Sequence, residues 1–152
     1  MRDASAPLPN GIGFAKPQQV SLSDGEWPAH VIASGSCCPL SSATPTNGAV
    51  FRRNDGHFES RYQTMVENGK VPFPNDPKQR CRSTALSCFY TQGEHDENVA
   101  VHEGWAALGT IVAHLTPEHG VIEQSGNDPR HFSLWLKRKY LANADTLFKV
   151  LP

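Results

Sequence analysis

The sequence has no long apolar run. No stretch of its 152 residues approaches the roughly 20 apolar residues that a membrane-spanning helix requires. The first twenty residues also lack the apolar core of about 7–15 residues that marks a secretory signal. We therefore expect no membrane partner and a cytoplasmic location. In that reducing compartment the four cysteines, which are Cys37, Cys38, Cys81 and Cys88, are expected to be reduced.

Apolar residues are scarce overall. They make up 38% of the chain, whereas about 45–50%, with glycine included, is typical of globular domains. The chain also has 12 prolines and 12 glycines, which indicates a protein rich in loops. Its length suits one domain with a real hydrophobic core. The net charge of −1 gives no overall indication of a nucleic-acid or membrane partner.

Basic residues are absent from one long segment. No lysine or arginine occurs between Arg82 and Arg130, although this segment carries seven carboxylates and four of the seven histidines. Residues 129–152, in contrast, hold five basic residues and one acidic residue. An acidic middle and a basic end are complementary, which favours self-association or docking onto a protein partner.

The apolar spacing predicts an α+β fold. We expect about three helices, near residues 56–68, 97–115 and 129–142, packed on a small mixed or antiparallel sheet. The second helix is predicted because apolar residues recur at helical spacing from Val101 to Leu115. The third follows from Asp128 as an N-cap and Pro129 at the first helical position. "GAVFRR", at residues 48–53, is typical of a strand.

The first 47 residues differ in composition from the rest. They are rich in proline and serine, with short runs such as "VSL" and "HVIAS" that are typical of strands. We therefore divide the chain into a loop-rich arm of residues 1–47, with short strands, and a single α+β domain of residues 48–152.

The histidines and carboxylates of the acidic segment suggest a metal site. Oxygen and imidazole ligands suit a divalent ion such as zinc, and such a site would serve a metal-dependent hydrolase. A zinc variant uses Cys81 and Cys88 with two of the histidines, because these four residues are spaced seven apart. "HEGWA" lacks the second histidine of a zinc-peptidase helix, so that mechanism is excluded. The candidate ligands are His95, Asp96, His102, Glu103 and His119.

The same residues allow other interpretations. Nearby carboxylates favour charged imidazolium, so the segment can act as a pH switch. It can also be a solvated acidic helix with no function of its own. A nucleophilic cysteine from "SGSCCPLSS", with His102 or His114 as its base, is a further alternative.

The sequence favours a small binding protein over an enzyme, because no catalytic motif has the required spacing. We expect a non-enzymatic assembly or regulatory protein, such as an accessory subunit, that acts through contacts with a protein partner or with another copy of itself. The metal-dependent hydrolase is the first alternative, and a nucleic-acid-binding accessory protein is the second. The candidate binding residues are Lys137, Arg138 and Lys139, with Trp105 and Trp135 as aromatic contacts.

Overall fold

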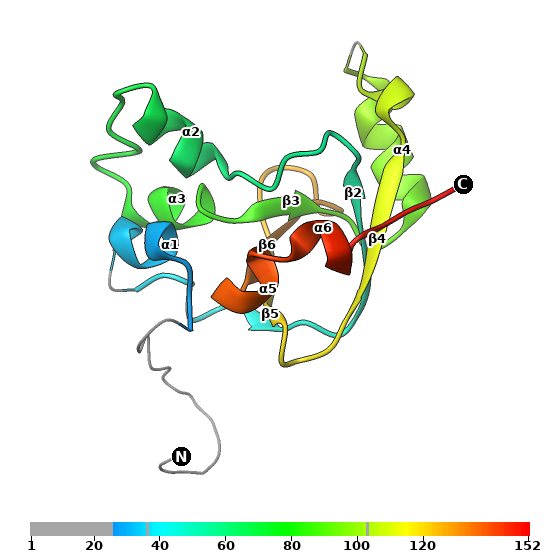
Figure 1. Cartoon of the computed structure of the whole chain (residues 1–152). Coiled ribbons are helices and arrows are strands. Elements are labelled where there is room, and N and C mark those ends of the chain that lie inside the picture. Colours follow the sequence, from blue (N-terminus) through cyan, green and yellow to red (C-terminus); the bar gives the residue numbers. More distant parts are fainter. Residues whose placement is uncertain (1–25, 36, 103) are drawn as a thin grey trace.

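The computed structural model describes residues 26–152 with the exception of Ser36 and Glu103. The described part of the chain is a mixture of helices and strands (Figure 1). In chain order the elements are α1 (Ala29–Ser34), β1 (Thr44–Pro45), β2 (Gly48–Arg53), α2 (Arg61–Glu67), α3 (Pro77–Arg82), β3 (Leu86–Cys88), α4 (Gln92–Ala100), the 3-10 helix η1 (Ala106–Leu108), β4 (Thr110–Leu115), β5 (Gly120–Gln124), β6 (Phe132–Leu136), α5 (Arg138–Leu141), α6 (Ala144–Leu147) and β7 (Lys149–Val150).

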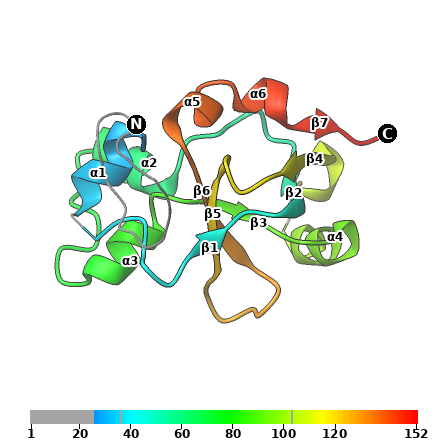
Figure 2. The same ribbon diagram turned by 90° about the horizontal axis from the view of Figure 1, so that it is seen from below.

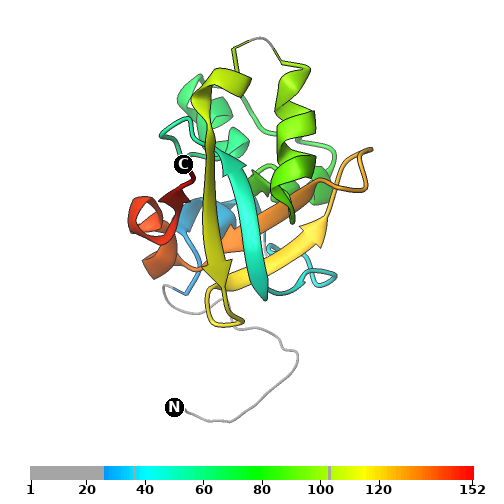
Figure 3. The same cartoon turned by 90° about the vertical axis from the view of Figure 1, so that its right-hand side faces the viewer.

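The strands form two antiparallel sheets. One has the order β1-β5-β6-β3 and the other has the order β2-β4-β7. β2 and β4 lie side by side and cross β5 and β6 obliquely (Figure 3). Helices α1, α2 and α3 gather at one end of the sheets, whereas α4 lies beside β2 and β4 at the other end (Figure 2). Within the described ranges, none of the helices is long and apolar enough to cross a membrane.

The chain passes from one sheet to the other at two adjacent corners, between β1 and β2 and between β4 and β5. Thr46, which is 1% exposed, joins these corners. Its backbone N–H donates to the Gly120 carbonyl (3.0 Å) and its hydroxyl donates to the Thr116 carbonyl (2.6 Å). A Cβ atom on Gly120 would lie 2.0 Å from the Trp135 carbonyl oxygen, so this corner requires glycine.

A second connection joins the two sheets away from the corners. Phe51 of β2 and Phe89, just beyond β3, exchange both backbone hydrogen bonds, at 2.8 and 3.0 Å. The main hydrophobic core fills the space between the sheets, where α6 also contributes. Its buried residues are Val50, Leu86, Cys88, Ile111, Ala113, Leu115, Ile122, Leu134, Leu136, Ala144 and Phe148.

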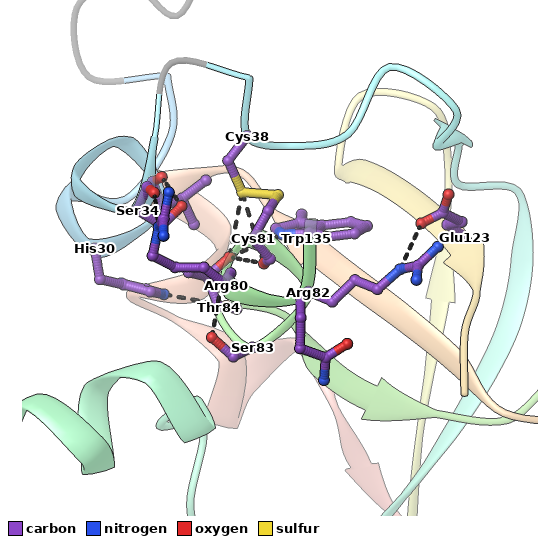
Figure 4. The surroundings of a disulfide bond; sticks show 12 residues. His30, Ser34, Cys38, Arg80, Cys81, Arg82, Ser83, Thr84, Glu123 and Trp135 are labelled. Atoms are coloured by element: carbon purple, nitrogen blue, oxygen red, sulfur yellow. Dashed lines mark hydrogen bonds and ion pairs between the residues drawn. A yellow bond between two sulfur atoms is a disulfide. The ribbon is translucent and has the colours of Figure 1, made fainter. Parts of the chain in front are cut away.

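A disulfide fastens the segment that precedes the sheets. Cys38 and Cys81 are bonded, with their Cα atoms 5.4 Å apart (Figure 4). Both pack with Trp27, Val31 and Trp135 in a second hydrophobic cluster. The expectation that all four cysteines are reduced is therefore wrong for these two. The sequence did not reveal the pair, because the two residues are 43 positions apart and meet only through tertiary packing.

The α+β class and the antiparallel pairing are confirmed, but the predicted number of helices is too low. The described residues contain six short α-helices and not about three. The helix predicted near 56–68 corresponds to α2, which begins later because Ser60 caps it in a capping box with Gln63. The predicted strand at 48–53 is β2. "HVIAS", predicted as a strand, lies in α1, and "VSL" lies outside the described residues.

The helix predicted at 97–115 is wrong over most of its length. α4 ends at Ala100, and the chain then makes turns at Gly104 (φ +83°) and Gly109 (φ +84°) before it enters β4. A left-handed φ interrupts a right-handed helix, and glycine tolerates it without steric cost. Val101, on the predicted apolar face, is 77% exposed. The apolar spacing matched a helix by chance, because Ile111 and Val112 belong to a buried strand.

The helix predicted at 129–142 is also mostly wrong. The Asp128 carboxylate accepts from the backbone N–H of Arg130 (2.9 Å) and so forms a local turn in place of a helix cap. β6 follows, and both of its faces are buried. One face, with Leu134, lies in the main core, while Trp135 on the opposite face packs in the second cluster. The division between an arm of 1–47 and a domain of 48–152 stays a prediction, since residues 1–25 are outside the described part.

Candidate functional site

A cleft with a volume of about 490 Å³ is the best candidate site. Residues from separate parts of the chain line it. They come from the end of β2, the segment that leads into α2, the end of α3, the strand β3, the helix α4 and the turn between β5 and β6. A concave surface built from several elements is the usual form of a ligand site. Of the residues predicted from sequence, His95 and Trp105 line this cleft.

Positive charge is concentrated on the cleft wall. Four arginines line it, together with the two carboxylates Asp55 and Glu59; the arginines are Arg52, Arg53, Arg61 and Arg82. Each arginine offers several N–H donors in a planar fork that matches carboxylate or phosphate oxygens. An anion in the cleft would therefore find more cationic partners than repulsive ones.

Arg52 is the most unusual of these arginines. It is only 8% exposed, and burial lowers its pKa. One guanidinium nitrogen, Nη1, donates to the Ser87 carbonyl (2.5 Å), and Nη2 lies 3.4 Å from the His57 carbonyl. Its Nε has no hydrogen-bond partner, and no carboxylate of the described residues forms an ion pair with it. A buried cation with only neutral partners is costly unless a ligand supplies the counter-charge.

Arg53 and Trp105 form a flat surface at the edge of the cleft. The Arg53 guanidinium carbon lies 3.8 Å from the centroid of the Trp105 ring, and Asp55 pairs with the same guanidinium at 2.9 Å. His102 packs on the same ring, with the two ring centroids 4.0 Å apart. This cation–π stack holds Arg53 in a defined orientation beside the buried Arg52.

A chain of hydroxyl and imidazole groups lines part of the cleft. His131 Nε2 lies 3.0 Å from the Ser87 hydroxyl. The other ring nitrogen, Nδ1, lies 3.1 Å from the Ser125 hydroxyl and 3.2 Å from the Ser125 carbonyl oxygen. The Ser125 hydroxyl in turn lies 2.7 Å from that of Ser133. Ser87 is exposed on β3, whereas Ser125 and Ser133 are buried.

His95 lies behind this chain. It is 1% exposed, and its Nδ1 lies 2.9 Å from an Asp96 carboxylate oxygen and 3.3 Å from the Thr110 hydroxyl. Its Nε2 has no partner among the described residues. The Phe89 ring makes edge contacts with both His95 and His131, with centroids 5.9 and 5.7 Å apart. The His95 ring is thus held by hydrogen bonds at Nδ1 only.

The predicted metal ligands lie in different places. His95 and Asp96 contact each other, His102 packs on Trp105, and His119 packs on Tyr140 with the ring centroids 4.5 Å apart. Among the residues that the structure describes, no three histidine, cysteine or carboxylate side chains are grouped as a metal site. Glu103 lies outside the described residues, so the five-residue site stays a prediction.

The cysteines of the zinc variant are not exposed thiolates. Cys81 is bonded to Cys38, and a disulfide sulfur carries no negative charge with which to bind zinc. Cys88 is fully buried in the main core, and burial raises the pKa of its thiol to about 12. At neutral pH Cys88 is therefore a protonated core residue.

The predicted binding residues are also dispersed. Lys137 pairs with Glu26 at 3.0 Å, while Arg138 and Lys139 are exposed on α5. Trp135 is 1% exposed, and its indole N–H donates to the Thr84 hydroxyl (2.9 Å), so it contacts the protein interior. Trp105 lines the cleft, whereas none of these basic residues does.

Arg52, Ser87 and His131 were not predicted from the sequence. The three come from positions up to 79 residues apart in the chain, and the cleft assembles them through the pairing of β3 with β6 and the bridge between Phe51 and Phe89. The one sequence signal was the pair of arginines at the end of the strand "GAVFRR". No protein-family model, curated protein or solved structure matches the chain.

Proposed function

We propose that the protein is a binding protein whose cleft takes up a small organic anion with a phosphate or carboxylate group. The observation that carries this proposal is Arg52, a buried guanidinium on the cleft wall with no carboxylate partner among the described residues. A protein that keeps such a cation loses stability by it, and an anionic ligand offsets that loss. Arg53, Arg61 and Arg82 supply further charge at the same cleft.

The cleft supports a ligand-binding role better than the predicted assembly through charged segments. The acidic and basic segments contact each other within the chain. Arg130 donates to a Glu97 carboxylate oxygen (2.5 Å), and the Tyr140 hydroxyl donates to Glu118 (2.6 Å). The Arg130–Glu97 ion pair leaves less unpaired charge for a second copy or a protein partner. In the cleft, Arg53 pairs with Asp55 and Arg82 pairs with Glu123, but Arg52 and Arg61 form no ion pair with a carboxylate of the described residues.

The disulfide bears on the location. Disulfides persist in oxidising compartments and are rare in the cytosol. Both sulfur-bearing residues are buried, at 1% and 3% exposure, within an apolar cluster that the bond helps to hold together. We therefore favour an oxidising compartment over the cytoplasm that was expected from the sequence.

Calorimetric titration with phenyl phosphate tests the proposed function, with benzyl alcohol as the neutral control. We expect phenyl phosphate to bind at one site and benzyl alcohol not to bind. The double variant Arg53→Gln/Arg61→Gln should weaken phenyl phosphate binding at least tenfold, because a hydrogen bond to a charged group contributes about 1.5–3 kcal/mol. The matched control is Arg138→Gln/Lys139→Gln, which removes two exposed charges from α5 and should leave the affinity unchanged.

Equal losses in the two double variants would contradict the proposal, since they would show attraction by overall charge and not a site in the cleft. Arg52→Gln adds an internal check. Without a ligand this variant should be at least as stable as the wild type, because it removes a buried charge. A large loss of stability in Arg52→Gln would mean that the guanidinium serves the fold itself.

A further inference from the structure

We propose that Ser87 is a nucleophile and His131 its general base, and that the cleft hydrolyses carboxylic esters. The choice of an ester with a negatively charged group rests on the proposed function, whereas the serine and histidine pair rests on its own geometry. The pair comes from two neighbouring strands. Ser87 is the middle residue of β3, it pairs with Ser133 in β6, and His131 immediately precedes β6.

The contacts of His131 define its role. Nδ1 lies 3.1 Å from the Ser125 hydroxyl, which can donate or accept, and 3.2 Å from the Ser125 carbonyl oxygen, which can only accept, so a proton on Nδ1 is the assignment that uses both contacts. In neutral imidazole the other nitrogen, Nε2, then carries the lone pair. Nε2 lies 3.0 Å from the Ser87 hydroxyl, which is the distance and direction that a general base needs. The three groups form a nucleophile, a base and a group that orients the base.

Exposure distinguishes Ser87 from its neighbours. Its side chain is on the exposed side of β3 and lines the cleft, whereas Ser125 and Ser133 are 6% and 5% exposed. Of these three serines, which all line the cleft, Ser87 is therefore the one most open to a substrate. The buried Ser125–Ser133 contact, at 2.7 Å, holds the turn that positions His131. The edge of the Phe89 ring supports the imidazole from another side.

Arg52 lies close to the nucleophile. Its Nη1 donates to the Ser87 carbonyl at 2.5 Å, so its positive charge is next to the backbone of the reacting residue. Negative charge that develops on a substrate carbonyl oxygen during attack is stabilised by a nearby cation in a partly buried site. The same guanidinium would thus attract the substrate and favour its transition state.

The reaction has two balanced steps. In the first, the Ser87 hydroxyl oxygen bonds to the ester carbonyl carbon while its proton moves to His131 Nε2. The bond between the carbonyl carbon and the alcohol oxygen then breaks, and the alcohol leaves with the proton from His131. In the second, His131 takes a proton from water as the water oxygen bonds to the acyl carbon. The bond between that carbon and the Ser87 oxygen then breaks, His131 returns the proton to Ser87, and the acyl group leaves as the carboxylic acid. Only water is consumed besides the ester.

Labelling with a fluorophosphonate tests the nucleophile on the full chain. The serine oxygen bonds to phosphorus, fluoride leaves, and the proton goes to His131. We expect one adduct per chain, located at Ser87 by peptide mass spectrometry and absent from Ser87→Ala. Because general-base catalysis contributes about 10²–10⁴-fold, His131→Gln should slow labelling by at least 100-fold. Ser41→Ala, which changes an exposed serine outside the cleft, should be labelled like the wild type.

Ester turnover tests the substrate class. We expect 4-nitrophenyl hydrogen succinate, which carries a carboxylate, to be cleaved at least tenfold faster than the neutral 4-nitrophenyl acetate. Arg53→Gln/Arg61→Gln should abolish this preference. The absence of an adduct at Ser87, or an unchanged labelling rate in His131→Gln, would contradict the assignment of Ser87 as the nucleophile and His131 as its base. If Ser87→Ala still binds phenyl phosphate in that case, the proposed anion site stands without the chemistry. If Ser87 is labelled but both esters are cleaved at equal rates, the proposed preference for an anionic ester is wrong.

Discussion

Removal of the Cys38–Cys81 disulfide should cost the protein about 4 kcal/mol of unfolding free energy. The bond closes a loop with a sequence separation of 43 residues. For a loop of this size, the chain-entropy relation gives a loss of about 13 cal/mol/K in the unfolded chain, or about 4 kcal/mol at 25 °C. That is a large share of the roughly 5–15 kcal/mol by which domains are usually stable.

The variant should be Cys38→Ala/Cys81→Ala. Both positions are buried in the cluster of Trp27, Val31 and Trp135, and alanine avoids the unsatisfied hydroxyl that serine would place there. Urea unfolding followed by tryptophan fluorescence gives the free energy. At a slope of about 2 kcal/mol/M, a loss of 4 kcal/mol lowers the midpoint by about 2 M.

The reducing agent provides the control for this prediction. The wild-type protein in a reducing agent should approach the stability of the double alanine variant, and the variant itself should not respond to the reducing agent. A difference below about 1 kcal/mol between oxidised and reduced wild type would refute the reasoning, because loop closure alone requires more. So would the absence of a peptide pair linked through Cys38 and Cys81 in a non-reducing digest.

Two other substitutions test the corner between the sheets and a surface hydrogen bond. Gly120→Ala should destabilise the protein by about 3 kcal/mol or prevent folding, because the added methyl group meets the Trp135 carbonyl. Thermal unfolding measures this loss. The control variant Gly93→Ala in α4 should show no such loss, because nothing lies within 4 Å of the added methyl group. The Tyr140 hydroxyl holds the pKa of Glu118 below its usual value, so Tyr140→Phe should raise that pKa in an NMR titration, and an unchanged pKa would contradict the assignment. Because the folded-state pKa of Glu118 is the lower one, its contribution to stability is present above the unfolded-state pKa and is lost as the pH falls through the folded-state pKa.

Local signals predicted those elements whose sequence preference and tertiary role agree. The alternation in "GAVFRR" identified β2, since Val50 and Arg52 point to buried surroundings while the residues between them are more exposed. The helix α2 was predicted because its apolar residues follow helical spacing and Asn68–Gly69 ends it. β2 alternates buried and more exposed residues, and in α2 the half-buried residues Tyr62, Gln63 and Met65 alternate with exposed ones, so both segments keep the periodicity that makes a sequence pattern informative.

The same reasoning failed where a strand is buried on both faces. β4 has five buried residues out of six and β6 has four out of five, so neither shows a period of two. Buried strands of this kind cannot be told from helices by periodicity alone. The turn at Asp128 added to the error, because an aspartate before a proline is typical of a helix start as well as of a local turn. Tertiary packing decides between these alternatives.

The cleft could not be predicted from local patterns, because its two walls depend on different long-range contacts. Ser87 and His131 are brought together by the pairing of β3 with β6, strands that also contribute to the main core. Arg82, which also lines the cleft, directly follows Cys81 in α3, and the disulfide ties that helix to the loop that follows α1 (Figure 4). Loss of the disulfide should therefore loosen the wall of α3 before it disturbs the pair on β3 and β6. In the reduced protein, Ser87 should still react with a fluorophosphonate while phenyl phosphate binds more weakly. If both decline together, the two walls form a single cooperative unit and the disulfide supports the whole site.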